Sequence, residues 1–254
     1  MITLRYAAGS DVGRVRQGNE DAAYAGARLL AVADGMGGHV GGEVASSAAI
    51  AAVAYLDHEC PGELVAAAEA GIRKANQRLR ELVEQDPSLT GMGTTLTLML
   101  WDGPRVALAH IGDSRAYLLR NGDLYQITYD HTLVQTLMDD GRITAEEAAR
   151  HPHRSILLQV LDGGDNTEPD LSLRDAEVGD RYLLCSDGLS GVVEAERLRH
   201  VLAEVDDLGE VTRQLIELAC EAGGPDNITC VVADVVEGPA EDDTPVVVGS
   251  ASPS

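Results

Sequence analysis

The stretch "TTLTLMLWDGPRVALAHIGDSRAYLLRNGDLYQIT", residues 94–128, narrows the possible folds more than any other part of the sequence. It contains several runs of β-favouring residues, separated by the dipeptides Asp102-Gly103 and Asn121-Gly122. Both dipeptides are typical of the tight turns that join neighbouring antiparallel strands. The stretch therefore predicts a meander of antiparallel strands.

The segments on either side of this meander add helices and further strands. Alternation and apolar periodicity predict strands at 2–11 and 22–34 (the second a hairpin), helices at 42–58 and 62–86, a strand ending at Asp187, helices at 194–205 and 208–223, and a closing strand at 227–236. This order predicts an α+β domain built on antiparallel sheets and not a parallel, doubly wound sheet.

Two segments depart from this pattern. Residues 130–165 are polar and contain helix signals, a glycine C-cap at Gly141 and a capping box that starts at Thr144, so we expect an insertion there. Residues 238–254 contain Pro, Ser and acidic residues without periodicity, which predicts a flexible tail or linker. The expected organisation is one domain at 1–237 followed by this tail.

The charge balance excludes several classes of partner. The chain has 19 Lys and Arg against 42 Asp and Glu, a formal net charge of −23. Nucleic acid and anionic membrane surfaces are therefore poor partners, because the field of the protein repels them. We expect no signal peptide and no membrane contact by this segment, since no apolar run approaches 18 residues.

Several aspartates occupy the same kind of position, at an end of an apolar strand. Asp34 follows "LLAVA", Asp113 follows "VALAHIG", Asp187 follows "RYLLCS", and Asp226 directly precedes the closing strand in "GGPDN". A fifth candidate, Asp21, stands where another strand begins. If these strands are neighbours in the sheets, their ends bring the carboxylates to one rim.

Such a cluster favours a metal site, because like charges resist joint ionisation and a divalent cation removes the conflict. An all-oxygen set of ligands selects Mg²⁺ or Mn²⁺, and a pair of such ions forms a hydrolytic centre. Gly35, which follows Asp34, lets its carbonyl approach an ion closely. Each aspartate taken alone is also a turn signal. A P-loop is not supported, since "GMGTTLT" lacks the lysine, and no organic cofactor is expected.

Six motifs, in order, resemble those of the metal-dependent Ser/Thr protein phosphatases, also called the protein phosphatase 2C-like family. They are "RQGNED", "VADGMGGHVGGEVAS", "GMGTTL", "AHIGDSRAYLL", "LLCSDGLSG" and "GGPDNIT". The resemblance runs from about Arg5 to Val236 and is to actinobacterial catalytic domains that oppose membrane-bound Ser/Thr kinases. It implies two packed antiparallel sheets flanked by helix pairs, a four-layer αββα arrangement, with residues 130–165 as a flap.

The resemblance also implies a role for each site residue. Asp34 would bridge two Mg²⁺ or Mn²⁺ ions, with the carbonyl of Gly35 on one ion and Asp187 and Asp226 on the other. Asp113, with Asp187, would hold a weaker third ion. Asp21 would hydrogen-bond metal-bound water, and Glu20 would lie beside the ligands. Arg16 would bind the phosphate with its planar, forked guanidinium.

The implied reaction is the hydrolysis of phosphoserine and phosphothreonine in proteins by in-line attack of a metal-bridging hydroxide. Eukaryotic relatives carry a histidine directly after the Asp-Gly pair, where this chain has Met36. His39, or else metal-bound water, would protonate the leaving alkoxide. The expected partners are phosphorylated proteins, namely Ser/Thr kinases and their substrates. We expect a cytoplasmic monomer, or the cytosolic domain of a longer membrane-anchored chain.

Two hypotheses from other classes accompany this one. The first is a catalytically weak or inactive regulator of the same fold that binds phosphoproteins, and the second is a structural metal-binding module. Mn²⁺-dependent turnover of a phosphate ester distinguishes the enzyme from both.

Overall fold

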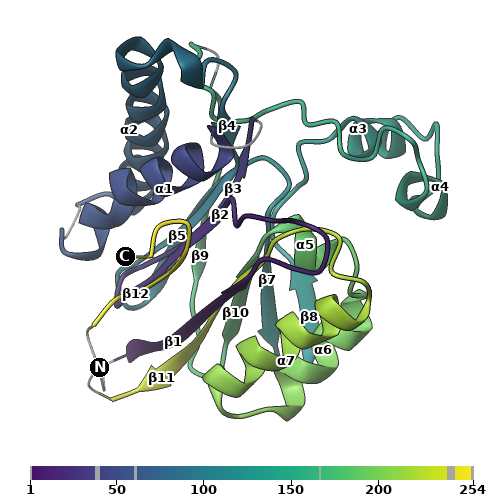
Figure 1. Cartoon of the computed structure of the whole chain (residues 1–254). Coiled ribbons are helices and arrows are strands. Elements are labelled where there is room, and N and C mark those ends of the chain that lie inside the picture. Colours follow the sequence, from purple (N-terminus) through teal and green to yellow (C-terminus); the bar gives the residue numbers. More distant parts are fainter. Residues whose placement is uncertain (1, 38–40, 60–61, 166, 239–243, 253–254) are drawn as a thin grey trace.

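Two antiparallel β-sheets pack face to face in the centre of the molecule, and a pair of helices covers the outer face of each (Figure 1). The computed structural model describes residues 2–37, 41–59, 62–165, 167–238 and 244–252. The first sheet has the strand order β1 (Ile2–Asp11), β11 (Ile228–Glu237), β10 (Arg181–Cys185), β7 (Arg115–Arg120) and β8 (Asp123–Gln126). The second has the order β12 (Val246–Gly249), β2 (Asp21–Ala25), β3 (Leu29–Met36), β5 (Leu96–Trp101), β6 (Arg105–Ile111) and β9 (Asp170–Asp175), with β4 (Gly93–Thr94) paired to β3.

The helices form the two outer layers and a projecting arm (Figure 1). The second sheet is covered by α1 (Gly41–Val53), which continues into the 3₁₀ turn η1 (Ala54–Asp57), and by α2 (Leu64–Gln85). The first sheet is covered by α6 (Ala195–Glu204) and α7 (Leu208–Glu221). The remaining helical elements are short: η2 (Pro87–Leu89), α3 (Leu133–Asp139), α4 (Ala145–Ala149) and α5 (Asp187–Ser190).

The apolar periodicity of the sequence explains how the layers pack. In α2 the buried residues Ala68, Ile72, Ala75 and Leu79 recur every three or four positions and face the second sheet. The helix ends at Gln85 because Pro87 disfavours helical geometry at Asp86, which is extended with φ −134° and ψ 94°. Between the sheets the core is made mostly of Ala, Val and Leu side chains, with Met99, Trp101 and Tyr182 as its large members.

The expected fold class is confirmed, with one change to the meander. Residues 94–128 do form antiparallel strands, but β5 and β6 pair in the second sheet whereas β7 and β8 pair in the first. The chain crosses between the sheets at 112–114, where turn signals alone cannot show that the next strand joins a different sheet. Asp113 lies in this crossing.

The structure corrects the expectation of a flexible tail. Residues 246–249 form β12, which pairs antiparallel with β2 at the edge of the second sheet, and β9 also lacked a sequence signal. Both are edge strands of a few residues, so alternation in the sequence is too short to reveal them. Pairing with an exposed sheet edge gives β12 its structure, although its local composition resembles a linker.

Within the insertion at 130–165, α3 and α4 lie in an arm that projects from the body (Figure 1). The end of the insertion returns to the body, where Leu161 is buried beneath α1 and α2. The expected capping box is present: Thr144 accepts from the Glu147 amide, and the Glu147 carboxylate accepts from the Thr144 amide. The first residue of the arm, Asp130, pairs with Arg115 of β7 at 2.6 Å. Over the described ranges, no helix combines the length and the apolarity needed to cross a bilayer.

Candidate active site

The five strand-end aspartates meet at one rim of the sandwich. Asp21 and Asp34 lie opposite each other on β2 and β3. Asp113 follows β6, Asp187 begins α5 directly after β10, and Asp226 stands two residues before β11. The negative charges of the other four all act on Asp34. The structure therefore brings all five aspartates together at one rim, with carboxylates contributed by both sheets.

Burial and mutual repulsion disturb the titration of this cluster. Burial, followed by the charges of Asp21 and Asp187, raises the pKa of Asp34 well above its ordinary value. Burial and neighbouring carboxylates raise the pKa of Asp21 and that of Asp113 to about 7 each. Burial and the charge of Asp226 also raise the pKa of Asp187, although a hydrogen bond with Asp34 opposes the shift. The raised pKa values disfavour the joint ionisation of these groups, and a bound cation would relieve their repulsion.

Asp21 provides a second sign that the cluster accommodates a further group. Its side chain is buried, and its Oδ2 accepts a hydrogen bond from Ser186 Oγ at 2.7 Å. Its Oδ1 is buried as well and has no hydrogen-bond partner among the described residues. A buried carboxylate oxygen without a donor is the kind of group that a water molecule or ion satisfies.

Hydrogen bonds from β4 and its neighbour fix the backbone at Asp34. The Asp34 amide donates to Thr95 Oγ1 at 2.9 Å, and Thr94 Oγ1 donates to the Asp34 carbonyl at 2.8 Å. Thr95 Oγ1 in turn shares a hydrogen bond with Ser114 Oγ, next to Asp113. The two aspartates are thus joined by a short chain of hydroxyl groups.

Only glycine fits at position 35. A Cβ atom there would lie 2.1 Å from the Gly42 carbonyl oxygen and 2.6 Å from that of Glu20. The Gly35 amide donates to the Glu20 carbonyl at 3.1 Å, so this backbone segment lies directly against the residue before Asp21. Close packing of backbone on both sides is consistent with a carbonyl that must take up a defined position.

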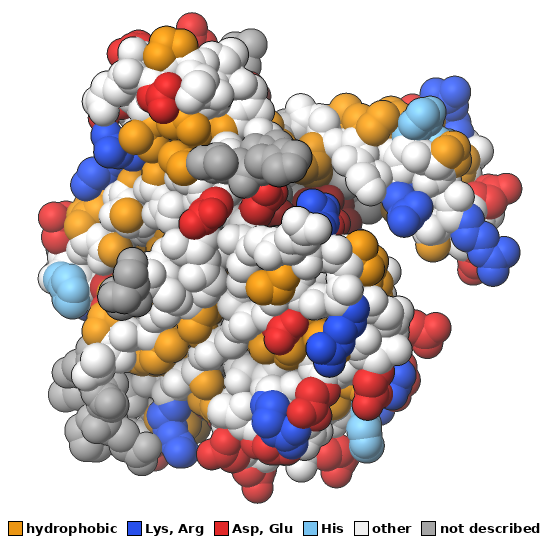
Figure 2. Space-filling view, in the orientation of Figure 1, with side chains coloured by type: hydrophobic (Ala, Val, Ile, Leu, Met, Phe, Trp, Pro, Cys, Tyr) orange, Lys and Arg blue, Asp and Glu red, His pale blue; other side chains and the backbone are white. Residues whose placement is uncertain are grey.

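Arg16 reaches the rim from the loop between β1 and β2. Its Nη2 atom donates to Asp226 Oδ2 at 2.8 Å, and its side chain remains 49% exposed. Partial burial is the largest single influence on Arg16 and lowers its pKa, but the hydrogen bond to Asp226 and the charges of Asp226, Glu20 and Asp34 together raise the pKa above its ordinary value. Figure 2 shows acidic side chains gathered in the hollow between the body and the arm, with a basic side chain beside them. The proposed phosphate-binding guanidinium is therefore next to the acids and open to solvent.

The ligand chemistry of the rim fits hard cations. Its donors are carboxylate and carbonyl oxygens, which are the ligands that Mg²⁺ and Mn²⁺ prefer. Among the described residues, no group of three or more His, Cys, Asp or Glu side chains is arranged to hold a metal ion. His39 lies outside the described residues, whereas Met36, in the position that is histidine in eukaryotic relatives, is the last residue of β3.

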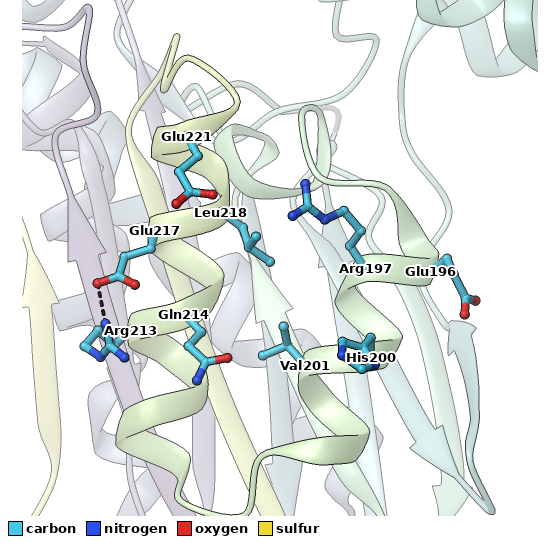
Figure 3. Close-up of a pocket in the computed structure, with 9 residues that line it drawn as sticks. All are labelled: Glu196, Arg197, His200, Val201, Arg213, Gln214, Glu217, Leu218 and Glu221. Atoms are coloured by element: carbon cyan, nitrogen blue, oxygen red, sulfur yellow. Dashed lines mark hydrogen bonds and ion pairs between the residues drawn. The ribbon is translucent and has the colours of Figure 1, made fainter.

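A cavity of about 370 Å³ separates the acids from the arm. Asp113 and Asp187 line it on the body, and Val134, Met138 and Arg154 line it on the arm. It provides room for a side chain that presents a phosphate to the acids. A larger cavity of about 670 Å³ lies between α6 and α7 (Figure 3), but helix-surface residues such as Glu217 and Arg213, which pair with each other, line it. We therefore assign the chemistry to the rim.

One buried residue that the sequence did not single out, Asn227, connects the loop between β1 and β2 to the start of β11. Asn227 is buried; its Oδ1 accepts from the Glu20 amide at 2.9 Å, and its Nδ2 donates to the carbonyls of Val12 and Gly18 at 2.9 Å each. It thereby positions the loop that bears Arg16 relative to Asp226. The signal was a polar residue directly before a mostly apolar strand, where burial requires several hydrogen-bond partners.

Comparisons with known proteins agree with this geometry. Residues 9–221 match the family described as protein phosphatase 2C. The chain is 54% identical over 252 residues to the serine/threonine protein phosphatase PstP of Mycobacterium tuberculosis, covering 99% of this chain and 49% of PstP. It is 36% identical to protein phosphatase PhpP of Streptococcus pneumoniae, covering 91% and 98% respectively. The chain thus spans about half the length of PstP.

Solved structures show the same relationship. The catalytic domain of PstP, crystallised in complex with two manganese ions, superimposes with a TM-score of 0.88 at 55% identity, covering 93% of this chain and all of that one. The serine/threonine phosphatase Stp1 of Staphylococcus aureus gives a TM-score of 0.82 at 33% identity, covering 92% and 96%.

Proposed function

Because this chain belongs to the protein phosphatase 2C family, we propose that it hydrolyses phosphoserine and phosphothreonine in proteins and requires Mn²⁺ or Mg²⁺. The observation that carries this proposal is the meeting of five strand-end carboxylates, from two different sheets, beside an exposed arginine. The two manganese ions in the PstP catalytic domain support the choice of cation.

The proposed ligands are the residues that crowd one another at the rim. Asp34 would bridge two ions, with the Gly35 carbonyl on one side and Asp187 and Asp226 on the other. Asp113, with Asp187, would hold a third and weaker ion. When bound, the ions supply Lewis acidity towards the phosphoryl group and acidify a water molecule that attacks it.

The other side chains act on the substrate or on the ligands. Arg16 would bind two phosphoryl oxygens, because its guanidinium is exposed at the rim and already held by Asp226. Asp21, whose Oδ1 has no partner within the described part of the chain, would accept a hydrogen bond from a water molecule of the site. Glu20 would support the Gly35 backbone through its carbonyl. His39 would protonate the leaving alkoxide, with water as the alternative.

The substrates in this proposal are phosphorylated proteins, including Ser/Thr kinases and the proteins they modify. The arm at 130–165 would act as a flap that shapes access to the cavity, since it lines that cavity opposite Asp113 and Asp187. We further propose a cytoplasmic monomeric domain that can form part of a longer, membrane-anchored chain.

Hydrolysis of p-nitrophenyl phosphate and of a phosphothreonine peptide tests the proposal directly. We expect turnover with Mn²⁺ and its loss with EDTA, followed by recovery when Mn²⁺ is added back in excess. Binding of the phosphopeptide without turnover would instead establish the phosphoprotein-binding regulator. Binding of Mn²⁺ with neither turnover nor peptide binding would establish the structural metal module.

A further inference from the structure

The C-terminal strand β12 ends directly against the acidic rim. It pairs with β2 in the register Val246↔Ala25, Val247↔Tyr24, Val248↔Ala23 and Gly249↔Ala22. The next residue of β2 is Asp21, and Asp21 in turn pairs with Asp34 on β3. One row of strand pairing therefore connects the end of β12 with two acids of the site. Figure 1 shows β12 at the edge of this sheet, close to the C-terminus.

The contact between β12 and Asp21 is specific. The Ser250 amide donates to the Asp21 carbonyl at 2.7 Å. Gly249 has a φ of 74°, and a Cβ atom there would lie 2.2 Å from that same carbonyl oxygen. A side chain at 249 would thus be strained in its backbone and would also displace Asp21. Gly249 and the Ser250 amide therefore both contact the backbone carbonyl of Asp21.

Ser250 also ties this contact to α1. Its Oγ shares a hydrogen bond of 2.9 Å with Ser46 Oγ, which is fully buried. Along β12 the side chains serve both faces of the sheet: Val247 packs against the core beneath α1 and α2, and Val246 and Val248 pack against the core between the sheets. The strand is therefore held in place independently of its contact with Asp21.

Asp21 is sensitive to such positioning. Its carboxylate is buried, with Oδ2 held by Ser186 and Oδ1 without a donor among the described residues. A shift of the Asp21 backbone would move both of its carboxylate oxygens relative to Asp34 and Asp187. The charge of Asp21 interacts with the charges of both residues. We propose that β12, through Gly249 and the Ser250 amide, is a positioning element of the metal site that sets its affinity for Mn²⁺ by fixing Asp21.

This inference rests on the proposed metal-dependent function, and its test compares variants within the full chain. Ser250→Pro removes the amide donor and places a ring carbon towards the Asp21 carbonyl. Ser250→Ala is the matched control, because it keeps the amide and loses only the hydroxyl bond to Ser46. Val247→Ala is the stability control, because it removes packing from β12 without contacting Asp21. Gly249→Val is a second disruptive variant.

Titration calorimetry with Mn²⁺ gives the affinity, and thermal denaturation without metal gives the stability. We expect the Kd for Mn²⁺ to rise about tenfold in Ser250→Pro and Gly249→Val, because Asp21, the proposed hydrogen-bond partner of a water molecule of the site, would move. The two controls should stay within about twofold of the wild type. Turnover of p-nitrophenyl phosphate should fall at low Mn²⁺ in the disruptive variants and recover at saturating Mn²⁺.

The outcomes separate this inference from the proposed function. If the wild type is active but Ser250→Pro binds Mn²⁺ as the wild type does, β12 has only a structural role and the inference is wrong. The same conclusion follows if Val247→Ala weakens Mn²⁺ binding as much as Ser250→Pro. A wild type without Mn²⁺-dependent turnover would refute the proposed function, and the positioning role with it. If Ser250→Pro does not fold, the Kd values for Mn²⁺ of Gly249→Val and Val247→Ala are compared instead. Equal Kd values in these two variants would show that the inference is wrong.

Discussion

Buried carboxylates lie at both ends of the β2–β3 hairpin, but their hydrogen-bonding environments differ. At the turn end, Asp57 accepts hydrogen bonds from Tyr24 Oη at 3.0 Å, from the Arg28 amide at 2.7 Å and from the Leu29 amide at 3.1 Å. Three donors from three residues leave this carboxylate well satisfied. Asp57 therefore connects η1 to the hairpin and serves the structure.

At the open end of the same hairpin, Asp21 and Asp34 lie among several other carboxylates. One buried oxygen of Asp21 has no partner among the described residues, and repulsion and burial raise the pKa of Asp34 well above its ordinary value. Hydrogen bonds with Thr94 and Thr95 fix the backbone at Asp34, whereas the buried Asp21 carboxylate has a donor at only one of its two oxygens among the described residues. The comparison shows that unsatisfied carboxylates, and not burial as such, mark the site.

Substitution of Asp34 should have the largest effect on activity and almost none on folding. In Asp34→Asn we expect turnover of a phosphothreonine peptide to fall by roughly a thousandfold, because a charged ligand is lost. The melting temperature without metal should stay equal or rise, since the substitution removes repulsion from a crowded cluster. Mn²⁺ should raise the melting temperature of the wild type but not that of the variant. Unchanged turnover would refute the site assignment.

Substitution of Asp57 should show the opposite pattern. Asp57→Asn replaces one of the two accepting oxygens by an NH₂ group and removes the negative charge from the other. Since the donors of Tyr24, Arg28 and Leu29 then lose a charged acceptor, we expect the free energy of unfolding to fall by about 2–3 kcal/mol. Activity per folded molecule should remain that of the wild type. Urea denaturation measures the first quantity, and Mn²⁺-dependent turnover at low temperature measures the second. A loss of turnover without a loss of stability would break the contrast between the two ends.

Asn227 should combine both effects, because it is buried and also supports the rim. In Asn227→Ala we expect the free energy of unfolding to fall by about 2 kcal/mol, since the Glu20 amide and two carbonyls lose their partner. The Kd for Mn²⁺ should also rise about tenfold as Asp226 moves. Denaturation and Mn²⁺ calorimetry measure the two changes. A stability loss with wild-type Mn²⁺ affinity would restrict Asn227 to a structural role.

Much of the site could be predicted from the sequence because its residues have short-range signals. Asp34, Asp187 and Asp226 each adjoin an apolar strand of five or more residues, and such strands are visible in a single sequence. What the sequence could not show was long-range. Nothing near Asp113 indicates that the chain passes there from one sheet to the other. Strand order depends on packing between the layers, and the turn dipeptides do not encode it.

The residues that were missed have the same explanation. Asn227 supports the rim through hydrogen bonds to residues more than 200 positions away in the sequence, and no local sequence pattern reveals such bonds. β12 is a short run of valines within a segment of Pro, Ser and acidic residues, and it pairs with β2, which is also distant in the sequence. Edge strands and buried polar residues obtain their structure from their partners, so they become evident only once the partners are in place.

Substitution of Arg16 should have the smallest effect, because Arg16 is exposed and lies outside the β2–β3 hairpin. We expect it to change substrate binding while stability and Mn²⁺ affinity stay close to those of the wild type. Its ion pair with Asp226 is open to solvent, so Arg16→Ala should change the free energy of unfolding by less than about 0.5 kcal/mol. The KM for a phosphothreonine peptide should rise about tenfold, since a charge-assisted hydrogen bond to the phosphate is lost. Mn²⁺ affinity should remain within about twofold of the wild type.

Arg16→Lys should give an intermediate KM, because the ammonium keeps the charge but not the planar fork. A lost metal site in Arg16→Ala would instead mean that Arg16 holds Asp226 in place for the ion and does not act on the substrate.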